Sequence, residues 1–327
     1  MVDSAYPLFP IAAFIGFAVA LIPLSWHASA WNAGTCMYMF WVSTTCLAEF
    51  INAIVWKGNL LNPAPIWCDI TAKLFVGAGV GLPAASLCIN RRLFNITSGK
   101  TVFITRADRF RTMMEDLAVS AGIPFLVMVL HIVVQGHRFN ILEDVGCASV
   151  TFNTLPAYFL VFMWPVLLGS ISFIYAGLTL RRFIVHRAEV TGVITNHAFL
   201  NVNRYFRLMV FATIDMMAVV PISVFNIYIG TKGVDLAPWI SWADTHFDFQ
   251  RVEFIPAIVW KTDGAFFISV EMGRWVYPLS SIVFFGVFGF TAEARKSYRR
   301  ITYWFARQVG WTRLADVVST TRPSPLP

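Results

Sequence analysis

Long apolar runs alternate with short polar segments along this chain. A transmembrane α-helix needs about 20 mostly apolar residues, and helices and closed barrels are the structures that satisfy their own backbone in lipid. The pattern therefore predicts an all-α membrane protein with a seven-transmembrane helix bundle. The seven runs cover residues 8–24, 35–56, 67–90, 117–135, 155–180, 208–229 and 264–290.

The third run is rich in small residues and is expected to be the helix around which the other six pack. Its small residues include Gly77, Gly79, Gly81, Ala84 and Ala85. Small side chains let neighbouring helices approach closely in membranes. Packing alone explains this pattern, and no binding role is assigned to these residues.

Composition supports a membrane protein and argues against nucleic acid as a partner. The chain has 327 residues, of which 57% are hydrophobic and 13% charged, whereas soluble domains carry about 25% charged residues. Its net charge is +7, but the basic residues cluster between apolar runs, which is a signal of membrane topology. The expected partner of the apolar surface is membrane lipid.

The basic residues also predict an orientation. Most of the 25 Lys and Arg residues lie in segments 91–116 and 181–207 and after residue 290. Cytoplasmic loops carry the excess of Lys and Arg, so the N-terminus is expected outside and the C-terminus in the cytoplasm, in a multi-pass plasma-membrane protein. Residues 1–290 would form the seven-helix bundle, and residues 291–327 a cytoplasmic tail with a short amphipathic helix on the inner leaflet.

Two of the five cysteines are expected outside the membrane. Cys68 begins the third run and Cys147 precedes the fifth, whereas the other three fall in the membrane or at its inner face. An oxidising exterior permits a disulfide, so we expect Cys68 and Cys147 to pair. The alternative is two unpaired thiols that share a side by coincidence.

Ionisable residues inside the runs are candidates for a ligand site, because such groups are costly in lipid and usually face the bundle interior. Glu49 and Lys73 lie at similar depths and could pair, and Glu271 and Arg274 are neighbours on one helix face. The alternative is internal ion pairs that fix helix register. Trp260 joins the candidates because it lies in a long acidic and aromatic outer segment, residues 230–263, which could act as a lid.

Arginines flank the predicted cytoplasmic helix ends. The positive-inside rule explains most of them, and a docking role for a cytoplasmic partner is a hypothesis added to it. The candidates are Arg91, Arg92, Arg181, Arg182 and Arg204.

No catalytic residues, metal site or cofactor are predicted. The chain lacks a P-loop, an HExxH motif and metal-binding Cys/His spacing, and a non-enzyme is expected. A small-solute transporter or channel is the competing class, because intramembrane charges suit it too. The absence of repeated halves disfavours many transporter folds.

Several motifs resemble the fungal mating-pheromone receptors, which are class D G-protein-coupled receptors, and most closely those of mushroom type. The motifs are FIGF at 14–17, PLSWH at 23–27, NPAPIWCDI at 62–70 and PAASLCINRRL at 83–93, and the block from 62 to 93 is the most specific. The resemblance covers essentially the seven-helix region.

This resemblance implies a function in signal transduction. A farnesylated peptide pheromone would bind outside, and a heterotrimeric G protein would respond inside and start the mating response. The oligomeric state is left open, with a homo-oligomer among the options.

Overall fold

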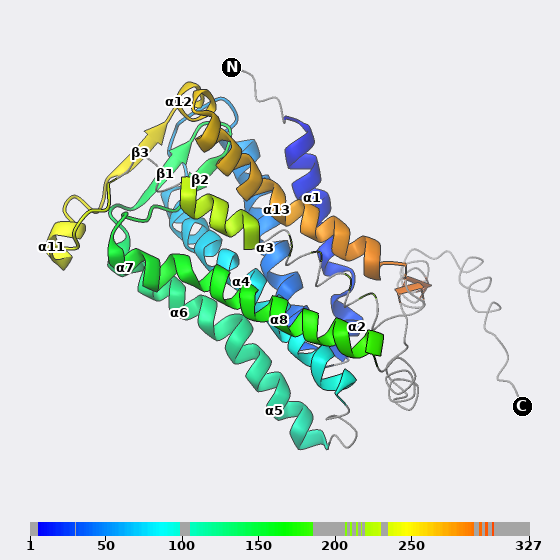
Figure 1. Ribbon diagram of the computed structural model, residues 1–327. Coiled ribbons are helices and arrows are strands. Elements are labelled where there is room, and N and C mark those ends of the chain that lie inside the picture. The colour runs from blue at the N-terminus through cyan, green and yellow to red at the C-terminus, as the bar shows by residue number, and fades with distance from the viewer. Residues whose placement is uncertain are drawn as a thin grey trace, which may run out of the picture.

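Helices dominate the structure, a computed structural model, and a small sheet lies at one end of them (Figure 1). The structure describes residues 6–29, 31–98, 105–185, 220–229 and 235–290, with single positions at 207, 210, 214, 217, 294, 295, 298, 299 and 303.

The first three predicted runs all form helices. They are α1 (Leu8–Leu21), followed by the short α2 (Leu24–Ser29), then α3 (Ala33–Val55) and α4 (Pro65–Thr97). Pro65 occupies the first turn of α4, where its missing N–H leaves no intrahelical bond unmade. The helix continues past Arg91 and Arg92, which the sequence placed in a loop, because Leu93 and Ile96 are buried in the core.

The fourth and fifth runs form two composite helices. The first joins α5 (Arg106–Leu117), η1 (Ala118–Gly122), α6 (Ile123–Leu130) and η2 (His131–Val134), and the second joins α7 (Leu155–Ala157), η3 (Tyr158–Phe162) and α8 (Met163–Val185). Thr105 caps α5 through a capping box with Asp108, an arrangement that satisfies backbone donors at a helix start.

The last part of the chain contains residues 220–229 in helical form, then α11 (Trp242–Thr245), β3 (Val252–Ile255), α12 (Ala257–Thr262) and α13 (Gly264–Phe288). Asp263 caps α13 by accepting hydrogen bonds from the backbone N–H groups of Ala265 and Phe266.

Four helices are long and apolar enough to cross a membrane within the described part of the chain: 33–55, 65–97, 106–134 and 155–185. The protein is therefore a helical membrane protein. Described helices also lie in the other three predicted runs. Helices 8–21 and 220–229 are shorter than these four, and the apolar sequence of α13 is interrupted by the charged residues Glu271 and Arg274. Most of the predicted amphipathic tail falls outside the described residues.

A three-stranded sheet, which the sequence did not predict, covers the end of the bundle where α3 ends and α4 begins (Figure 1). Strands β1 (Phe139–Leu142) and β2 (Gly146–Ala148) form an antiparallel hairpin, and β3 pairs with β1 in parallel, giving the order β2-β1-β3. Strand β2 begins directly after the hairpin turn with Gly146 at φ +97°, a conformation that glycine adopts without steric cost.

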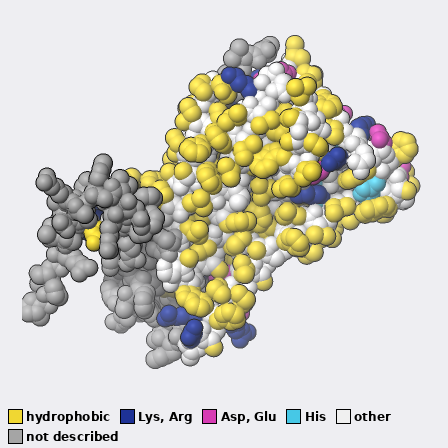
Figure 2. Space-filling view, turned by 180° about the vertical axis from the view of Figure 1, so that it is seen from behind, with side chains coloured by type: hydrophobic (Ala, Val, Ile, Leu, Met, Phe, Trp, Pro, Cys, Tyr) yellow, Lys and Arg dark blue, Asp and Glu magenta, His cyan; other side chains and the backbone are white. Residues whose placement is uncertain are grey.

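The core is shared by α3 and α4. Helix α4 packs against α3, α6 and α8, whereas α1 and α13 pack mainly against α3 and each other. The expectation that six helices surround the third was therefore wrong for α1 and α13. The molecular surface between the two ends is largely hydrophobic on the face shown in Figure 2, as a lipid-facing surface requires.

Candidate functional site

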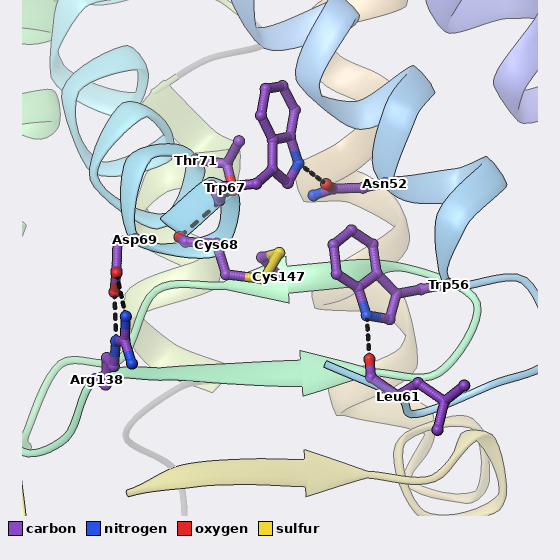
Figure 3. The surroundings of a disulfide bond; sticks show 9 residues. All are labelled: Asn52, Trp56, Leu61, Trp67, Cys68, Asp69, Thr71, Arg138 and Cys147. Atoms are coloured by element: carbon purple, nitrogen blue, oxygen red, sulfur yellow. Dashed lines mark hydrogen bonds and ion pairs between the residues drawn. A yellow bond between two sulfur atoms is a disulfide. The ribbon is translucent and has the colours of Figure 1, made fainter. Parts of the chain in front are cut away.

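A disulfide joins the sheet to the start of α4 (Figure 3). Cys68 Sγ and Cys147 Sγ are 2.01 Å apart, which confirms the predicted pair. Cys147 lies opposite Ile141 in the β1–β2 ladder, and both residues are buried in one cluster with Trp56 and Phe139. The disulfide therefore attaches the hairpin directly above the helix ends.

Polar contacts orient the helix ends beneath this sheet. Trp67 Nε1 donates to Asn52 Oδ1 at 2.8 Å and so links α4 to α3. The guanidinium of Arg138 donates to both carboxylate oxygens of Asp69, with Nε at 2.8 Å from Oδ1. These hydrogen bonds raise the pKa of Arg138 above its ordinary value.

The hairpin turn anchors the segment that leads into α13. Lys261 Nζ bonds Asp144 Oδ2 at 2.6 Å, and the backbone N–H of Ala257 donates to Glu143 Oε2 at 2.7 Å. Trp260 is fully buried and donates from Nε1 to the carbonyl oxygen of Glu143 at 3.1 Å. A buried indole whose one donor is already used is a structural support, so we leave Trp260 out of the proposed ligand site.

An ion pair lies in the first half of α13. Arg274 Nε donates to Glu271 Oε2 at 3.0 Å, and Trp275 Nε1 donates to the same oxygen at 3.0 Å. The guanidinium lies 4.5 Å from the centre of the Phe9 ring. Glu271 and Arg274 are therefore the helix neighbours that their spacing predicted.

Glu49 on α3 lies within electrostatic range of Arg274. Its side chain is buried, and its Oε2 has no hydrogen-bond partner among the described residues. Two carboxylates thus approach one guanidinium at a depth where charge is costly. We call Glu49, Glu271 and Arg274 the acidic cluster.

Lys73 does not pair with Glu49, contrary to the pairing that the sequence suggested. Its Nζ lies 2.8 Å from His131 Nδ1 and 2.6 Å from Gln135 Oε1. The ammonium therefore points toward the composite helix 106–134, while Glu49 is on α3. The ionisable residues predicted to form one ligand site therefore form two sites: the acidic cluster and a separate site around Lys73.

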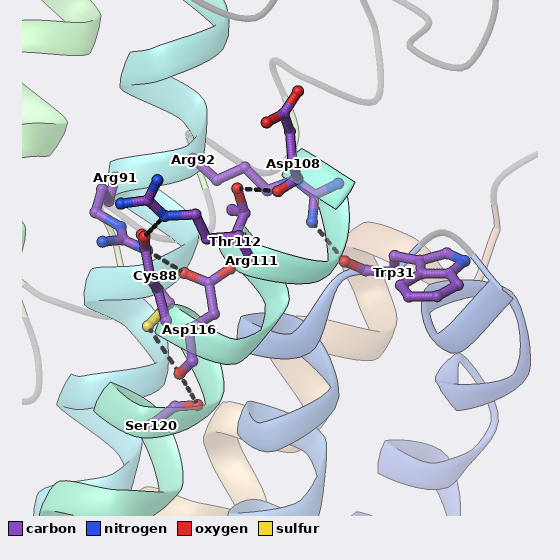
Figure 4. A network of polar contacts seen from close by, with 10 residues as sticks. Trp31, Cys88, Arg91, Arg92, Asp108, Arg111, Thr112, Asp116 and Ser120 are labelled. Atoms are coloured by element: carbon purple, nitrogen blue, oxygen red, sulfur yellow. Dashed lines mark hydrogen bonds and ion pairs between the residues drawn. The ribbon is translucent and has the colours of Figure 1, made fainter. Parts of the chain in front are cut away.

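A second polar network lies at the opposite end of the bundle (Figure 4). Arg91 on α4 bonds the buried Asp116 at 2.8 Å and lies 3.4 Å from Glu115, which in turn bonds Arg111. The carbonyl oxygen of Asp116 accepts from Cys88 Sγ and, at 2.6 Å, from Ser120 Oγ. Arg91 is thus a link between α4 and α5.

The other cytoplasmic candidates differ in their surroundings. Arg92 Nη1 donates to the carbonyl oxygen of Trp31 at 2.9 Å, Arg182 lies over the Phe94 ring at 5.3 Å, and Arg181 is exposed. Arg204 lies outside the described residues. Among the four described arginines, Arg181 and Arg182 offer the most exposed positions for a partner.

Sequence reasoning missed His131, Gln135 and Asp116 as members of these networks. All three are polar residues in or beside the fourth apolar run, so the signal that identified Glu49 and Lys73 applied to them as well. Within the described ranges, no group of three or more His, Cys, Asp and Glu side chains could hold a metal ion.

Comparison with known proteins identifies the family. Residues 8–307 match the family described as pheromone A receptor. The chain is 43% identical to the pheromone B alpha 2 receptor of Schizophyllum commune, over 98% of this chain and 50% of that protein. It is 32% identical to pheromone receptor 1 of Mycosarcoma maydis, over 91% of this chain and 83% of the relative.

A more distant relative is the pheromone a factor receptor of Saccharomyces cerevisiae, at 27% identity over 90% of this chain and 62% of the relative. The chain spans about half the length of the pheromone B alpha 2 and B alpha 3 receptors of Schizophyllum commune. With nearly the whole chain aligned to such receptors, it belongs to the pheromone A receptor family.

Proposed function

We propose that this chain is a seven-span G-protein-coupled receptor of the plasma membrane. Its ligand would be a farnesylated peptide mating pheromone, and its response the activation of a heterotrimeric G protein. Membership of the pheromone A receptor family supports this function. The observation that carries it is the acidic cluster, where Arg274 is held by Glu271 and approached by Glu49 between α1, α3 and α13.

A ligand activates a receptor only through its differential affinity for two states. Changing the active state from rare to dominant needs about 5.5 kcal/mol of differential binding. Burial of a prenyl chain supplies about 0.8 kcal/mol per CH₂, but it activates only if the chain is bound differently in the two states. The acidic cluster can supply that difference, because movement of α13 against α3 would change the surroundings of the buried Glu49 and the partly buried Glu271.

We expect Glu49→Gln, Glu271→Gln and Arg274→Met each to alter the pheromone response by about tenfold or more in half-maximal concentration or in basal activity. Glu271→Gln and Arg274→Met break the ion pair, and breaking a buried ion pair costs about 3–5 kcal/mol. Glu49→Gln removes the second acid that acts on Arg274. The measurement is nucleotide exchange on a purified G protein, driven by a panel of farnesylated peptides. Surface abundance of each variant is measured in parallel.

Glu253→Gln is the matched control. It neutralises an outer carboxylate whose side chain is 51% exposed and lies 3.6 Å from His137. Wild-type responses from all three cluster variants at normal surface abundance would refute the cluster assignment. Solute flux through reconstituted vesicles, without nucleotide exchange, would instead favour a transporter or channel.

A further inference from the structure

Lys73 differs from Arg274 and Lys261, two other cations at the outer end of the bundle, in the kind of partner that it has. Arg274 pairs with Glu271, and Lys261 pairs with Asp144. The ammonium of Lys73 is bonded only to an imidazole nitrogen and an amide oxygen within the described part of the chain. It is a half-buried charge that this part of the protein does not neutralise.

The nearest acid along the same helix is already occupied. Asp69 lies one turn before Lys73, at a spacing where opposite charges normally pair. Both oxygens of Asp69 instead bond Arg138. Arg138 also accepts, through its backbone carbonyl, a 2.6 Å hydrogen bond from Gln135 Nε2. Arg138 thus occupies Asp69, which could otherwise pair with Lys73. It also orients Gln135, whose amide oxygen accepts from Lys73.

The second acceptor is also fixed in place. His131 is buried, and its Nε2 lies 3.0 Å from Thr151 Oγ1. Because Nδ1 accepts from the ammonium of Lys73, Nε2 is the nitrogen that carries the proton in the neutral ring. An ammonium has three N–H donors, and two are used here. Lys73 is therefore held in one position, with one donor that no described residue accepts.

The outer segment 230–263 contacts the composite helix 106–134, which carries both acceptors of Lys73 or ends beside them. His246 Nε2 lies 2.9 Å from the carbonyl oxygen of Ile132, and Trp239 Nε1 donates to that of Val133 at 3.4 Å. Both acceptors lie within two residues of His131 along η2. This segment therefore contacts the same turn of helix that holds His131, the residue bonded to Lys73.

We propose that Lys73 binds a carboxylate of the ligand peptide, and this inference rests on the function proposed above. An N⁺–H···O⁻ bond to a carboxylate is stronger than a neutral hydrogen bond, and it would neutralise the charge of Lys73. That charge lies about 12 Å along α4 from the start of the helix, at about 1.5 Å per residue. The carboxylate is supplied either by an Asp or Glu side chain or by a free C-terminus.

The test uses the full chain and the most active farnesylated peptide from the panel. That peptide is made in matched forms, with each Asp or Glu changed to its amide and with the C-terminus as free acid or methyl ester. Each form is assayed on wild type, Lys73→Met and Lys73→Arg. Lys57→Met is the control, since Lys57 is an exposed outer lysine that lies over the Tyr6 ring.

We expect Lys73→Met to raise the half-maximal concentration of the carboxylate form by about 10- to 100-fold, the range for one hydrogen bond to a charged group. The amide or ester form should be weak on wild type and no weaker on Lys73→Met. Lys73→Arg should keep the preference for the carboxylate, and Lys57→Met should behave as wild type. The form that loses activity on wild type identifies the source of the carboxylate.

Equal loss of both peptide forms on Lys73→Met would overturn the inference, because it would show a structural role. So would a wild-type receptor that responds equally to all forms, or an active peptide without any carboxylate. The comparison of carboxylate with amide or ester peptides on the wild-type receptor still tests whether a peptide carboxylate is needed, even where Lys73→Met does not reach the surface. A failure of the proposed function is distinct, since no farnesylated peptide would then activate the receptor at all.

Discussion

At the scale of single residues, the small side chains of α4 have unequal roles. A Cβ atom on Gly81 would lie 2.4 Å from Trp41 Nε1, and the indole cannot move easily because Nε1 donates to the carbonyl oxygen of Ser120 at 2.9 Å. A Cβ on Gly79 would meet nothing within 4 Å. Both glycines fit a pattern of small residues, but only Gly81 permits a close helix contact.

We therefore expect Gly81→Ala to destabilise the protein and Gly79→Ala to have little effect. Overpacking a well-filled site costs about 1–3 kcal/mol, whereas alanine at an open helical position is neutral or slightly stabilising. Thermal unfolding of the purified protein in detergent measures both. Equal stability of the two variants would show that Trp41 adapts, contrary to the contacts described here.

A contact between two polar side chains was predictable from the sequence where one helix carries both partners. Glu271 and Arg274 are three positions apart, so their contact follows from helical geometry. Lys73 and its acceptors lie 58 and 62 positions apart, and no local spacing indicates such a pair. The Glu49–Lys73 pairing was wrong because equal depth in the membrane does not determine which helix faces which.

At the scale of elements, the three-stranded sheet is the feature that the sequence did not indicate. Its strands have three or four residues each, which is too short for a recognisable alternation of apolar and polar residues. The parallel pairing joins Phe139 to Val252 across two separate loops. The disulfide was predictable, because only two cysteines were expected on the outer side.

Removal of the disulfide should loosen the sheet from α4. The bond spans 79 residues, and loss of a native disulfide typically costs about 2–5 kcal/mol. We expect the double variant Cys68→Ser/Cys147→Ser to unfold at a lower temperature than wild type and to respond more weakly to peptide. A reductant should lower the unfolding temperature of wild type but leave that of the double variant unchanged.

Cys36→Ser provides the control, because Cys36 is a free, partly buried cysteine. This variant should keep the sensitivity of wild type to reductant. A double variant as sensitive to reductant as wild type would show that the effect has another origin.

At the scale of the whole molecule, the apolar runs predicted where helices occur, because twenty apolar residues have few other structures in lipid. The ends of the helices were less predictable. Helix α4 and the composite helix 106–134 both extend beyond their apolar runs at one end, where the pair Arg91–Asp116 connects them. Charged residues satisfied by each other can continue a helix, so polarity alone does not locate its end.

The two ends of the bundle should lie on opposite sides of the membrane, and α4 connects them. The disulfide end suits an oxidising exterior, and the end with Arg91, Arg109 and Arg111 suits the cytoplasm. We expect Lys57→Cys to react with a membrane-impermeant maleimide in intact cells and Arg111→Cys to react only after permeabilisation. Both sites are exposed, and the unmodified chain gives the background from Cys36, Cys46 and Cys88. Equal labelling in intact cells would place both ends on one side, which is incompatible with α4 as a membrane span and with a ligand and a G protein that act across it.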